Sequence, residues 1–220
     1  MLMDKEWLTI ALAKGRILPP TLELLTAAGI NCAELYTDSR KLIFTVPEQK
    51  LLFVLGKPTD IPTYVEYGAA DLGVVGKDIL LEQEKELYEL LDLKLGACRL
   101  VVAGRAGSRK FTGGYVATKY PRITEKYFQQ QGKQFEIIKL HGSVELAPLL
   151  NLADFIVDLV STGKTLAENQ LVEVETITYI TSRLIANPGS YQVKGERVMA
   201  LTKMLEKALG EKEGQDAKTV

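Results

Sequence analysis

The segment Asp154–Leu166 reads DFIVDLVSTGKTL, and its three parts decide how the chain around it folds. The apolar run Phe155–Val160 predicts a buried strand, and the small polar residues Ser161–Thr165 predict a tight loop. A helix is predicted over Thr165–Leu171. Strand, loop and helix in this order form the repeating unit of α/β proteins with mainly parallel strands.

The same order of elements recurs on the amino-terminal side of this segment. The apolar stretch Trp7–Ala13 predicts a strand, and Leu18–Ala28 predicts a helix because its apolar residues recur at helical spacing. The middle third of the chain repeats the pattern with a strand at Tyr115–Thr118, a helix at Pro121–Gln131 and a strand at Phe135–Leu140. We therefore expect an α/β fold with a mixed, mainly parallel sheet in each of two lobes.

One alternating, β-branched segment is too long for a single ordinary strand. It is Val172–Ile185, and we interpret it as a strand that leaves the second lobe and returns to the first. Asn187 and Pro188 then predict the start of a helix that ends near Leu209. The expected lobes are residues 1–95 with 179–210, and residues 96–178, followed by a polar tail at 211–220.

Composition excludes several classes of function. The chain has 220 residues, 46% of them apolar, and a formal net charge of -1, so it lacks the basic excess that nucleic-acid binding needs. No apolar run is long enough to cross a membrane, and Met1–Trp7 carries charges without a signal core, so the expected location is the cytoplasm. Cys32 and Cys98 form no metal or disulfide pattern, and His141 is the only histidine, which excludes a multi-histidine metal site.

The loop Ser161–Thr165 has the chemistry of a phosphate site. Small residues and Gly163 let backbone N–H groups converge on one anion, hydroxyl groups add donors, and Lys164 adds a full positive charge. The Walker pattern needs a glycine where this chain has Asp158, and a carboxylate there would repel a polyphosphate. A sugar phosphate fits better, because a carboxylate on the preceding strand can accept hydrogen bonds from ribose hydroxyls. Asp154 shares the expected face of that strand, although it can instead cap the strand's start.

A longer composite pattern resembles the signature of the ATP phosphoribosyltransferase family. Its parts are Gly142–Pro148 (GSVELAP), Ala153-Asp154 and Ile156–Leu166 (IVDLVSTGKTL). The resemblance extends over nearly the whole chain through Ala13–Arg16 (AKGR), Asp38–Arg40 (DSR) and Ala70–Asp78 (ADLGVVGKD).

This resemblance implies a two-lobed, periplasmic-binding-protein-like (type II) fold with the active site in the cleft. It implies transfer of a phosphoribosyl group from PRPP to N1 of ATP, giving phosphoribosyl-ATP and pyrophosphate, as the first step of histidine biosynthesis. Mg²⁺ is the implied cofactor, carried by the substrate phosphates without protein ligands. The chain resembles the short form of the family, which implies a hetero-oligomer with a regulatory subunit similar to histidyl-tRNA synthetase.

Site residues follow from the loop chemistry and the resemblance together. Negative charge develops on pyrophosphate as it leaves, which calls for fixed cations, so the catalytic candidates are Arg16 and Arg40. The candidates for binding PRPP are Asp154, Asp158, Ser161, Thr162, Gly163, Lys164, Thr165 and Glu145. The candidates for binding the nucleotide are Lys14, Gly15, Arg16, Asp71 and Lys77.

Two other functions remain open at the level of sequence. Two-lobed folds also serve as solute receptors, so the chain could be a ligand-binding protein without catalysis. It could also be a phosphoribosyltransferase with another acceptor, such as a nucleobase. A catalytically silent subunit is disfavoured, because the phosphate loop and both arginines are present.

Overall fold

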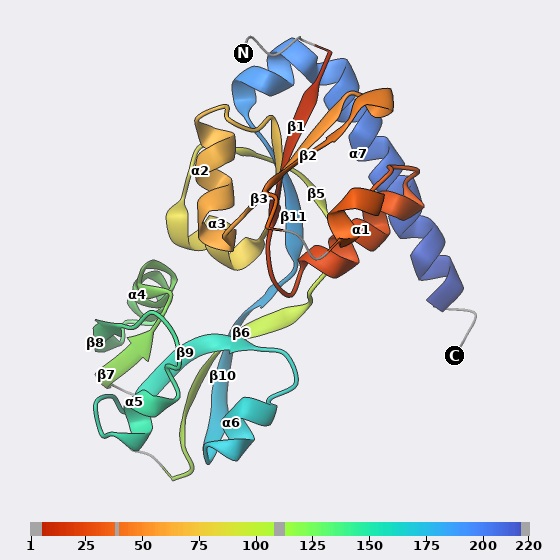
Figure 1. The fold of residues 1–220 in the computed structure, drawn as a ribbon. Coiled ribbons are helices and arrows are strands. Elements are labelled where there is room, and N and C mark those ends of the chain that lie inside the picture. Colours follow the sequence, from red (N-terminus) through yellow and green to blue (C-terminus); the bar gives the residue numbers. More distant parts are fainter. Residues whose placement is uncertain (1–5, 38–39, 108–112, 217–220) are drawn as a thin grey trace. The chain divides into compact units, whose positions relative to one another are not determined.

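Residues 6–37, 40–107 and 113–216 are described by the structure, a computed structural model, with side chains described as far as residue 212. The chain divides into two units (Figure 1). Unit 1 comprises Met1–Leu80, Lys85–Gly96 and Thr181–Val220, and unit 2 comprises Leu81–Glu84 and Ala97–Ile180. The two crossings lie within two residues of the expected lobe boundaries, whereas the assignment of residues 81–84 to unit 2 was not expected.

Unit 1 is built on a six-stranded sheet in the order β2-β3-β1-β4-β11-β5. Its strands are β1 (Leu8–Ala13), β2 (Ile43–Val46), β3 (Leu51–Gly56), β4 (Leu72–Gly76), β5 (Tyr88–Asp92) and β11 (Ser182–Ala186). Its helices are α1 (Leu18–Ala27), α2 (Ile61–Glu66), α3 (Lys77–Gln83) and α7 (Pro188–Asp216), with short 3-10 turns η1 (Ala33–Tyr36), η2 (Pro47–Gln49) and η3 (Pro58–Asp60). β1, β3, β4 and β5 run in one direction, and β2 and β11 run in the other.

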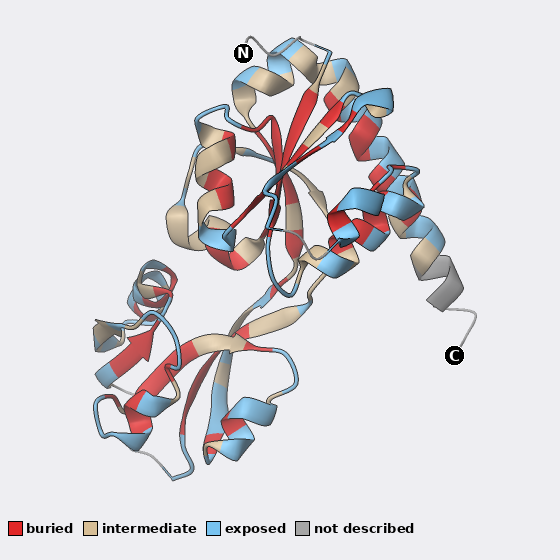
Figure 2. Ribbon diagram, in the orientation of Figure 1, coloured by how far each residue is buried: buried red, intermediate tan, exposed pale blue. Residues whose placement is uncertain are grey.

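Both faces of this sheet are covered, so its central strand is buried throughout (Figure 2). Ile10 and Leu12 of β1 pack in the cluster that contains the apolar residues of α1 and α7. Ala11 and Ala13 face the other way and pack against α2 and α3. The alternation follows from the two-residue period of a strand, and because both faces of β1 are buried, Thr9 is the only polar residue among its six.

Unit 2 is built on a five-stranded sheet in the order β10-β6-β9-β7-β8. Its strands are β6 (Cys98–Arg105), β7 (Gly113–Thr118), β8 (Gln134–Lys139), β9 (Phe155–Val160) and β10 (Leu171–Ile180), and its helices are α4 (Pro121–Gln130), α5 (Leu146–Leu149) and α6 (Lys164–Glu168). β7, β8, β9 and β10 run in one direction, opposite to β6. α4 packs on one face of the sheet, and α5 and α6 pack on the other.

Most of the expected elements are present, with differences at their ends. The long segment predicted to cross between the lobes is divided at Thr181 into β10 and β11. Asn187 caps α7, since its Oδ1 accepts a hydrogen bond of 2.8 Å from the Ser190 N–H. The prediction that this helix ends near Leu209 is wrong, because α7 continues to Asp216.

Two exposed ion pairs involve the part of α7 that was not predicted. Lys207 and Glu211 are one turn apart with 3.8 Å between Nζ and Oε1, and Lys212 reaches Glu23 of α1 at 3.7 Å. Such pairs support an exposed helical end. Although α7 is long, neither it nor any other described helix is apolar enough to span a membrane.

Candidate functional site

The carboxyl ends of the parallel strands β7, β8 and β9 share one edge of the unit 2 sheet. The chain leaves β7 toward α4 on one face and leaves β9 toward α6 on the other face. Ligands of open α/β sheets bind where neighbouring strands lead to opposite faces in this way. The predicted phosphate loop, Ser161–Thr165, follows β9 directly and therefore lies at this point.

The backbone of this loop presents hydrogen-bond donors to solvent. Gly163 has a left-handed conformation (φ 78°, ψ 0°), and the Lys164 N–H donates to the Thr162 hydroxyl at 3.4 Å. Within the described residues, the backbone N–H groups of Ser161, Thr162 and Gly163 have no protein acceptor. Such unpaired, exposed donors are what an anion site requires.

The helix after the loop contributes less to anion binding than the sequence suggested. α6 starts at Lys164 and has only five residues, so its dipole is small and the loop itself must supply the donors. The Lys164 ammonium is exposed and 3.8 Å from Glu168 Oε1, one turn further along. A surface pair of this kind is weak, so Lys164 can turn to another anion at little cost.

Asp158 lies in β9 three residues before Ser161, the first residue of the loop, and it is half-buried. Its neighbours Ile156 and Val160 pack in the cluster of α5 and α6, so the two-residue period places Asp158 on that same face. Asp158 is therefore close to the phosphate loop and partly accessible to solvent. A carboxylate that accepts hydrogen bonds from ribose hydroxyls needs both properties.

Asp154 lies at the other end of the same strand. Its Oδ2 accepts a hydrogen bond of 3.0 Å from the Tyr115 N–H, while its own N–H donates to the Tyr115 carbonyl at 2.9 Å. β9 has six residues, which separates Asp154 from the loop by about 20 Å. The expectation that Asp154 contacts the same sugar phosphate as the loop does not fit this geometry, and the carboxylate instead fixes the pairing of β7 with β9.

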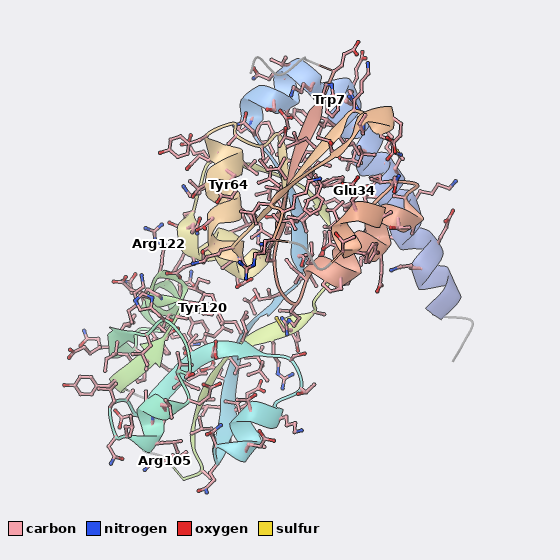
Figure 3. The ribbon with its side chains drawn as sticks, in the orientation of Figure 1. Trp7, Glu34, Tyr64, Arg105, Tyr120 and Arg122 are labelled. Carbon is pink, nitrogen blue, oxygen red and sulfur yellow. The ribbon has the colours of Figure 1, made fainter. Side chains whose placement is uncertain are left out.

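The two edges of unit 2 can be followed in Figure 3. Tyr120 comes just after β7, at the carboxyl edge, and Arg105 ends the antiparallel β6, at the amino edge. A pocket of about 270 Å³ lies at the amino edge, lined by Arg105, Tyr115, Pro148, Asn151, Leu152, Ala153 and Asp154. Asp154 belongs to that pocket and not to the phosphate loop.

Glu145 lies in the loop that follows β8, whose carboxyl end shares the edge with β9. It is half-buried and occupies the position before α5, where its side chain forms no capping hydrogen bond. His141 is in the same loop and is exposed. The topology thus brings Glu145 to the correct edge of the sheet, and its contact with ribose stays a prediction.

The carboxyl edge of the β1 and β3 strands in the unit 1 sheet carries most of the predicted cationic residues. Lys14, Gly15 and Arg16 follow β1 and are exposed, and Gly15 is left-handed (φ 100°). Arg40 is also exposed, and it precedes β2, whose start pairs with the end of β3 at this same edge. Asp38 and Ser39, the other parts of that motif, lie outside the described residues.

Lys77 and Lys57 complete this cationic edge. Lys77 follows β4 and is 2.5 Å from Glu89, so part of its charge is already neutralised. Lys57 follows β3 and is exposed, and the pairing of Ala13 with Gly56 makes it the neighbour of Lys14. The sequence did not single out Lys57, because only the strand register places it beside Lys14.

Asp71 has a structural role instead of the expected contact with a nucleotide. It precedes β4, at the opposite edge from Lys77, and it is buried. Its carboxylate accepts hydrogen bonds from the Thr9 N–H (2.8 Å), the Ser190 hydroxyl (2.6 Å) and the Lys194 ammonium (2.9 and 2.8 Å). These partners occupy both oxygens, so Asp71 does not fit the nucleotide site.

Comparison with known proteins identifies the family. A family model described as HisG: ATP phosphoribosyltransferase matches residues 57–207. The chain is 55% identical over 217 residues to an ATP phosphoribosyltransferase of Syntrophotalea carbinolica, covering 96% of this chain and 99% of that one. The chain belongs to the ATP phosphoribosyltransferase family. ATP phosphoribosyltransferase 2 of Geobacter sulfurreducens is likewise 55% identical, over 92% of this chain and 98% of that one.

Solved structures agree with this membership. The ATP phosphoribosyl transferase (HisG:HisZ) complex from Thermotoga maritima contains a chain that matches with a TM-score of 0.80 and 33% identity, over 93% of this chain and 99% of that one. The sulphonate-binding protein SsuA from Escherichia coli matches with a TM-score of 0.61 and 15% identity, over 97% of this chain and 71% of that one. The second likeness shows the fold alone, which confirms the predicted periplasmic-binding-protein-like architecture.

The chain is therefore an enzyme of the short form of this family. ATP phosphoribosyltransferases move the phosphoribosyl group of PRPP to ATP in the first step of histidine biosynthesis, and this is the predicted activity. The family needs a divalent metal. Among the residues that the structure describes, no cluster of His, Cys, Asp and Glu could hold a metal ion.

Proposed function

We propose that Ser161–Thr165 binds the 5-phosphate of PRPP and that Asp158 accepts hydrogen bonds from the ribose hydroxyls. The single observation that carries this proposal is the row of unpaired N–H groups around the left-handed Gly163, at the switch point of the unit 2 sheet. The hydroxyls of Ser161, Thr162 and Thr165 add donors, and Lys164 adds charge. Glu145 is a second candidate for the ribose, from the neighbouring loop.

The cationic edge of unit 1 suits the other charges of the reaction. During transfer, a bond forms between N1 of adenine and C1 of the ribose, and the bond from C1 to the pyrophosphate oxygen breaks. Pyrophosphate leaves with the electron pair, so negative charge grows on it in the transition state. Arg16 and Arg40 are proposed to stabilise that charge. Lys14, Lys57 and Lys77, with the Gly15 backbone, are proposed to hold nucleotide phosphates.

Mg²⁺ is the proposed metal. A hard divalent ion of this kind is commonly bound through substrate phosphates with few protein ligands. Bound to pyrophosphate, the ion would supply neutralising charge, while the protein's arginines direct the leaving group. The cytoplasmic location stays a prediction.

A regulatory subunit similar to histidyl-tRNA synthetase is the proposed partner. The support is the Thermotoga maritima relative, which was solved as a HisG:HisZ complex and which matches nearly the whole of this chain. We propose that this chain forms a hetero-oligomer of the same kind, with catalysis on this chain and regulation on the partner.

One assay tests the proposed function. The purified chain is mixed with ATP, PRPP and Mg²⁺, and phosphoribosyl-ATP is followed by its ultraviolet absorbance, with pyrophosphatase present to remove pyrophosphate. Parallel reactions contain Mn²⁺ or Ca²⁺ in place of Mg²⁺, and the partner subunit from the same source is added or omitted. We expect product with Mg²⁺ and a higher rate with the partner. Equal rates with and without the partner would contradict the hetero-oligomer proposal.

A further inference from the structure

Arg99 lies next to the phosphate loop, on the antiparallel neighbour of the strand that leads into it. It pairs with Val160 in the register of β6 and β9. Its Nε and Nη2 donate to the carboxylate of Glu173, with distances of 2.9 Å from Nε and 2.8 Å from Nη2 to Oε2. Its Nη1 lies 3.5 Å from the carbonyl oxygen of Ser161, the first residue of the loop. That contact is long, but it joins a full charge to a carbonyl dipole.

Glu173 is itself held in place. It belongs to β10, and the Thr176 hydroxyl donates to its Oε1 at 2.7 Å. The pairing of β10 with β6 shifts register between Glu173 and Glu175, and such bulges re-aim side chains. Hydrogen bonds from Arg99 hold the pKa of Glu173 below its usual value, and the bond to Glu173 raises the pKa of Arg99. Both groups are therefore charged at neutral pH.

The contact with Ser161 has a consequence for the next peptide group. A trans peptide is planar, so its C=O and N–H point in opposite directions. When Arg99 holds the Ser161 carbonyl toward β6, the Thr162 N–H must point away from β6. The Thr162 N–H is one of the loop donors without a protein acceptor in the described part of the chain.

We propose that Arg99 and Glu173 are a positioning pair for PRPP, which sets the direction of the first donors of the loop. The inference rests on the proposed role of Ser161–Thr165 and extends it to two residues outside the family motif quoted above. Glu173 orients the Arg99 guanidinium, and Arg99 orients the Ser161 peptide. Neither residue needs to touch the substrate.

Charge gives the pair a second effect at this site. A carboxylate near a phosphate is repulsive unless it is neutralised, and Arg99 neutralises Glu173. Loss of Arg99 therefore removes the contact with Ser161 and also exposes the phosphate to an unpaired negative charge. Loss of Glu173 removes only the orientation of the guanidinium. The two side chains are 31% and 28% exposed, and a pair this accessible adds little to global stability.

The variants Arg99→Lys and Glu173→Gln test the proposal. Lysine keeps the charge but cannot contact a carboxylate and a carbonyl with one planar group. We expect each variant to bind ribose 5-phosphate and PRPP about tenfold more weakly, the size of one lost charge-assisted hydrogen bond. The Michaelis constant for PRPP should rise by a similar factor, while kcat and the Michaelis constant for ATP stay near those of the native chain.

Arg105→Lys is the matched control. Arg105 is on the same strand and the same face, and its Nη2 also donates to a carbonyl oxygen, that of Leu149 at 3.1 Å. It lies at the opposite edge of the sheet, so its replacement should leave ribose 5-phosphate binding unchanged. Melting temperatures of all variants establish that each one folds. The double variant Arg99→Ala/Glu173→Gln should bind PRPP more tightly than Arg99→Ala, because the unpaired carboxylate is gone.

The two proposals fail in different ways. Calorimetry with ribose 5-phosphate reports on the loop without requiring catalysis. A native chain that binds it as weakly as Arg99→Lys and Glu173→Gln overturns the positioning role. A native chain that binds it tenfold more tightly than those variants, yet makes no phosphoribosyl-ATP, supports the positioning role and overturns the proposed function.

Discussion

Lys194 places its side-chain nitrogen 2.9 and 2.8 Å from the two carboxylate oxygens of Asp71, and both side chains are largely buried. The same nitrogen donates to the Trp7 carbonyl at 2.8 Å, so one ammonium joins α7 to the starts of β1 and β4. α7 leaves helical geometry at Lys194 (φ -119°, ψ 22°), where the side chain turns toward the sheet. Because water does not screen this pair, it fixes the position of α7 on the six-stranded sheet.

The first prediction concerns this pair. Lys194→Met leaves the buried Asp71 carboxylate without its ammonium, and breaking a buried pair from one side costs about 3–5 kcal/mol. We expect urea unfolding of the variant to show a loss of that size. The added change Asp71→Asn should restore part of the loss, because no unpaired charge then remains. Lys207→Met, on the exposed side of the same helix, serves as the control. A loss below about 1 kcal/mol for Lys194→Met would mean that the pair adds no more than a surface ion pair.

A second prediction separates the two aspartates of β9. Asp158→Asn replaces the proposed ribose acceptor, and we expect kcat/KM for PRPP to fall about a hundredfold, in the range seen when a catalytic hydrogen-bonding group is lost. Asp154→Asn should leave that constant near the native value, because Asp154 is bonded to Tyr115 at the other end of the strand. Steady-state kinetics at saturating ATP measures both variants. Equal losses of kcat/KM for the two variants would show that Asp154 also contributes to the PRPP site.

The strand, turn and helix around Ser161–Thr165 could be predicted from sequence because their properties are local. Gly163 adopts the left-handed backbone that glycine favours, and the small residues beside it leave the N–H groups open. The distance between Asp154 and the loop could not be read from the shared face alone. A spacing of four residues on a strand gives a shared face, but it also gives a separation of about 13 Å along the strand.

Residues that depend on distant partners were not predictable from sequence alone. Asp71 looked like a ligand-binding carboxylate, but its partner Lys194 is 123 positions away along the chain. Lys57 and Arg99 become candidates only when the pairings of β1 with β3 and of β6 with β9 are known. Strand register is set by packing and by turn geometry over the whole sheet. A short sequence motif therefore does not reveal which strands pair or in which register.

A third prediction concerns Lys57. Lys57→Ala removes a cation next to Lys14, and we expect the Michaelis constant for ATP to rise about tenfold, as for one lost contact with a phosphate. The effect should shrink as salt is raised, because screening already weakens the contact in the native chain. Lys203→Ala, an exposed lysine of α7, is the control. An unchanged constant for ATP at low salt would remove Lys57 from the nucleotide site.

A fourth prediction uses the alkaline range. Burial, followed by the hydrogen bond to Glu175, raises the pKa of Tyr127 to about 12, from the usual 10.0. The unfolded chain loses the phenol proton first, so the stability due to this group is complete below pH 10 and is lost as the pH rises toward 12. Tyr127→Phe should therefore flatten the fall in unfolding free energy between those values. Urea titrations at several pH values measure the unfolding free energy of both proteins. If it falls equally steeply with pH in Tyr127→Phe and in the native chain, folding does not raise the pKa of Tyr127.

The last prediction concerns Gly163. Gly163→Ala puts a side chain at φ 78°, where L residues are strained by about 1–2 kcal/mol, although the nearest atom to the new Cβ is 3.9 Å away. The loop can relieve this strain by moving Gly163 out of the left-handed region, which turns the N–H groups away from their common direction. We expect weaker PRPP binding together with a small loss of stability. Gly132→Ala is the matched control, because Gly132 follows the end of α4 at φ 64° with nothing within 4 Å of a Cβ. It should lose similar stability and bind PRPP normally. If both variants bind PRPP as tightly as the native chain, the left-handed glycine does not shape the phosphate site.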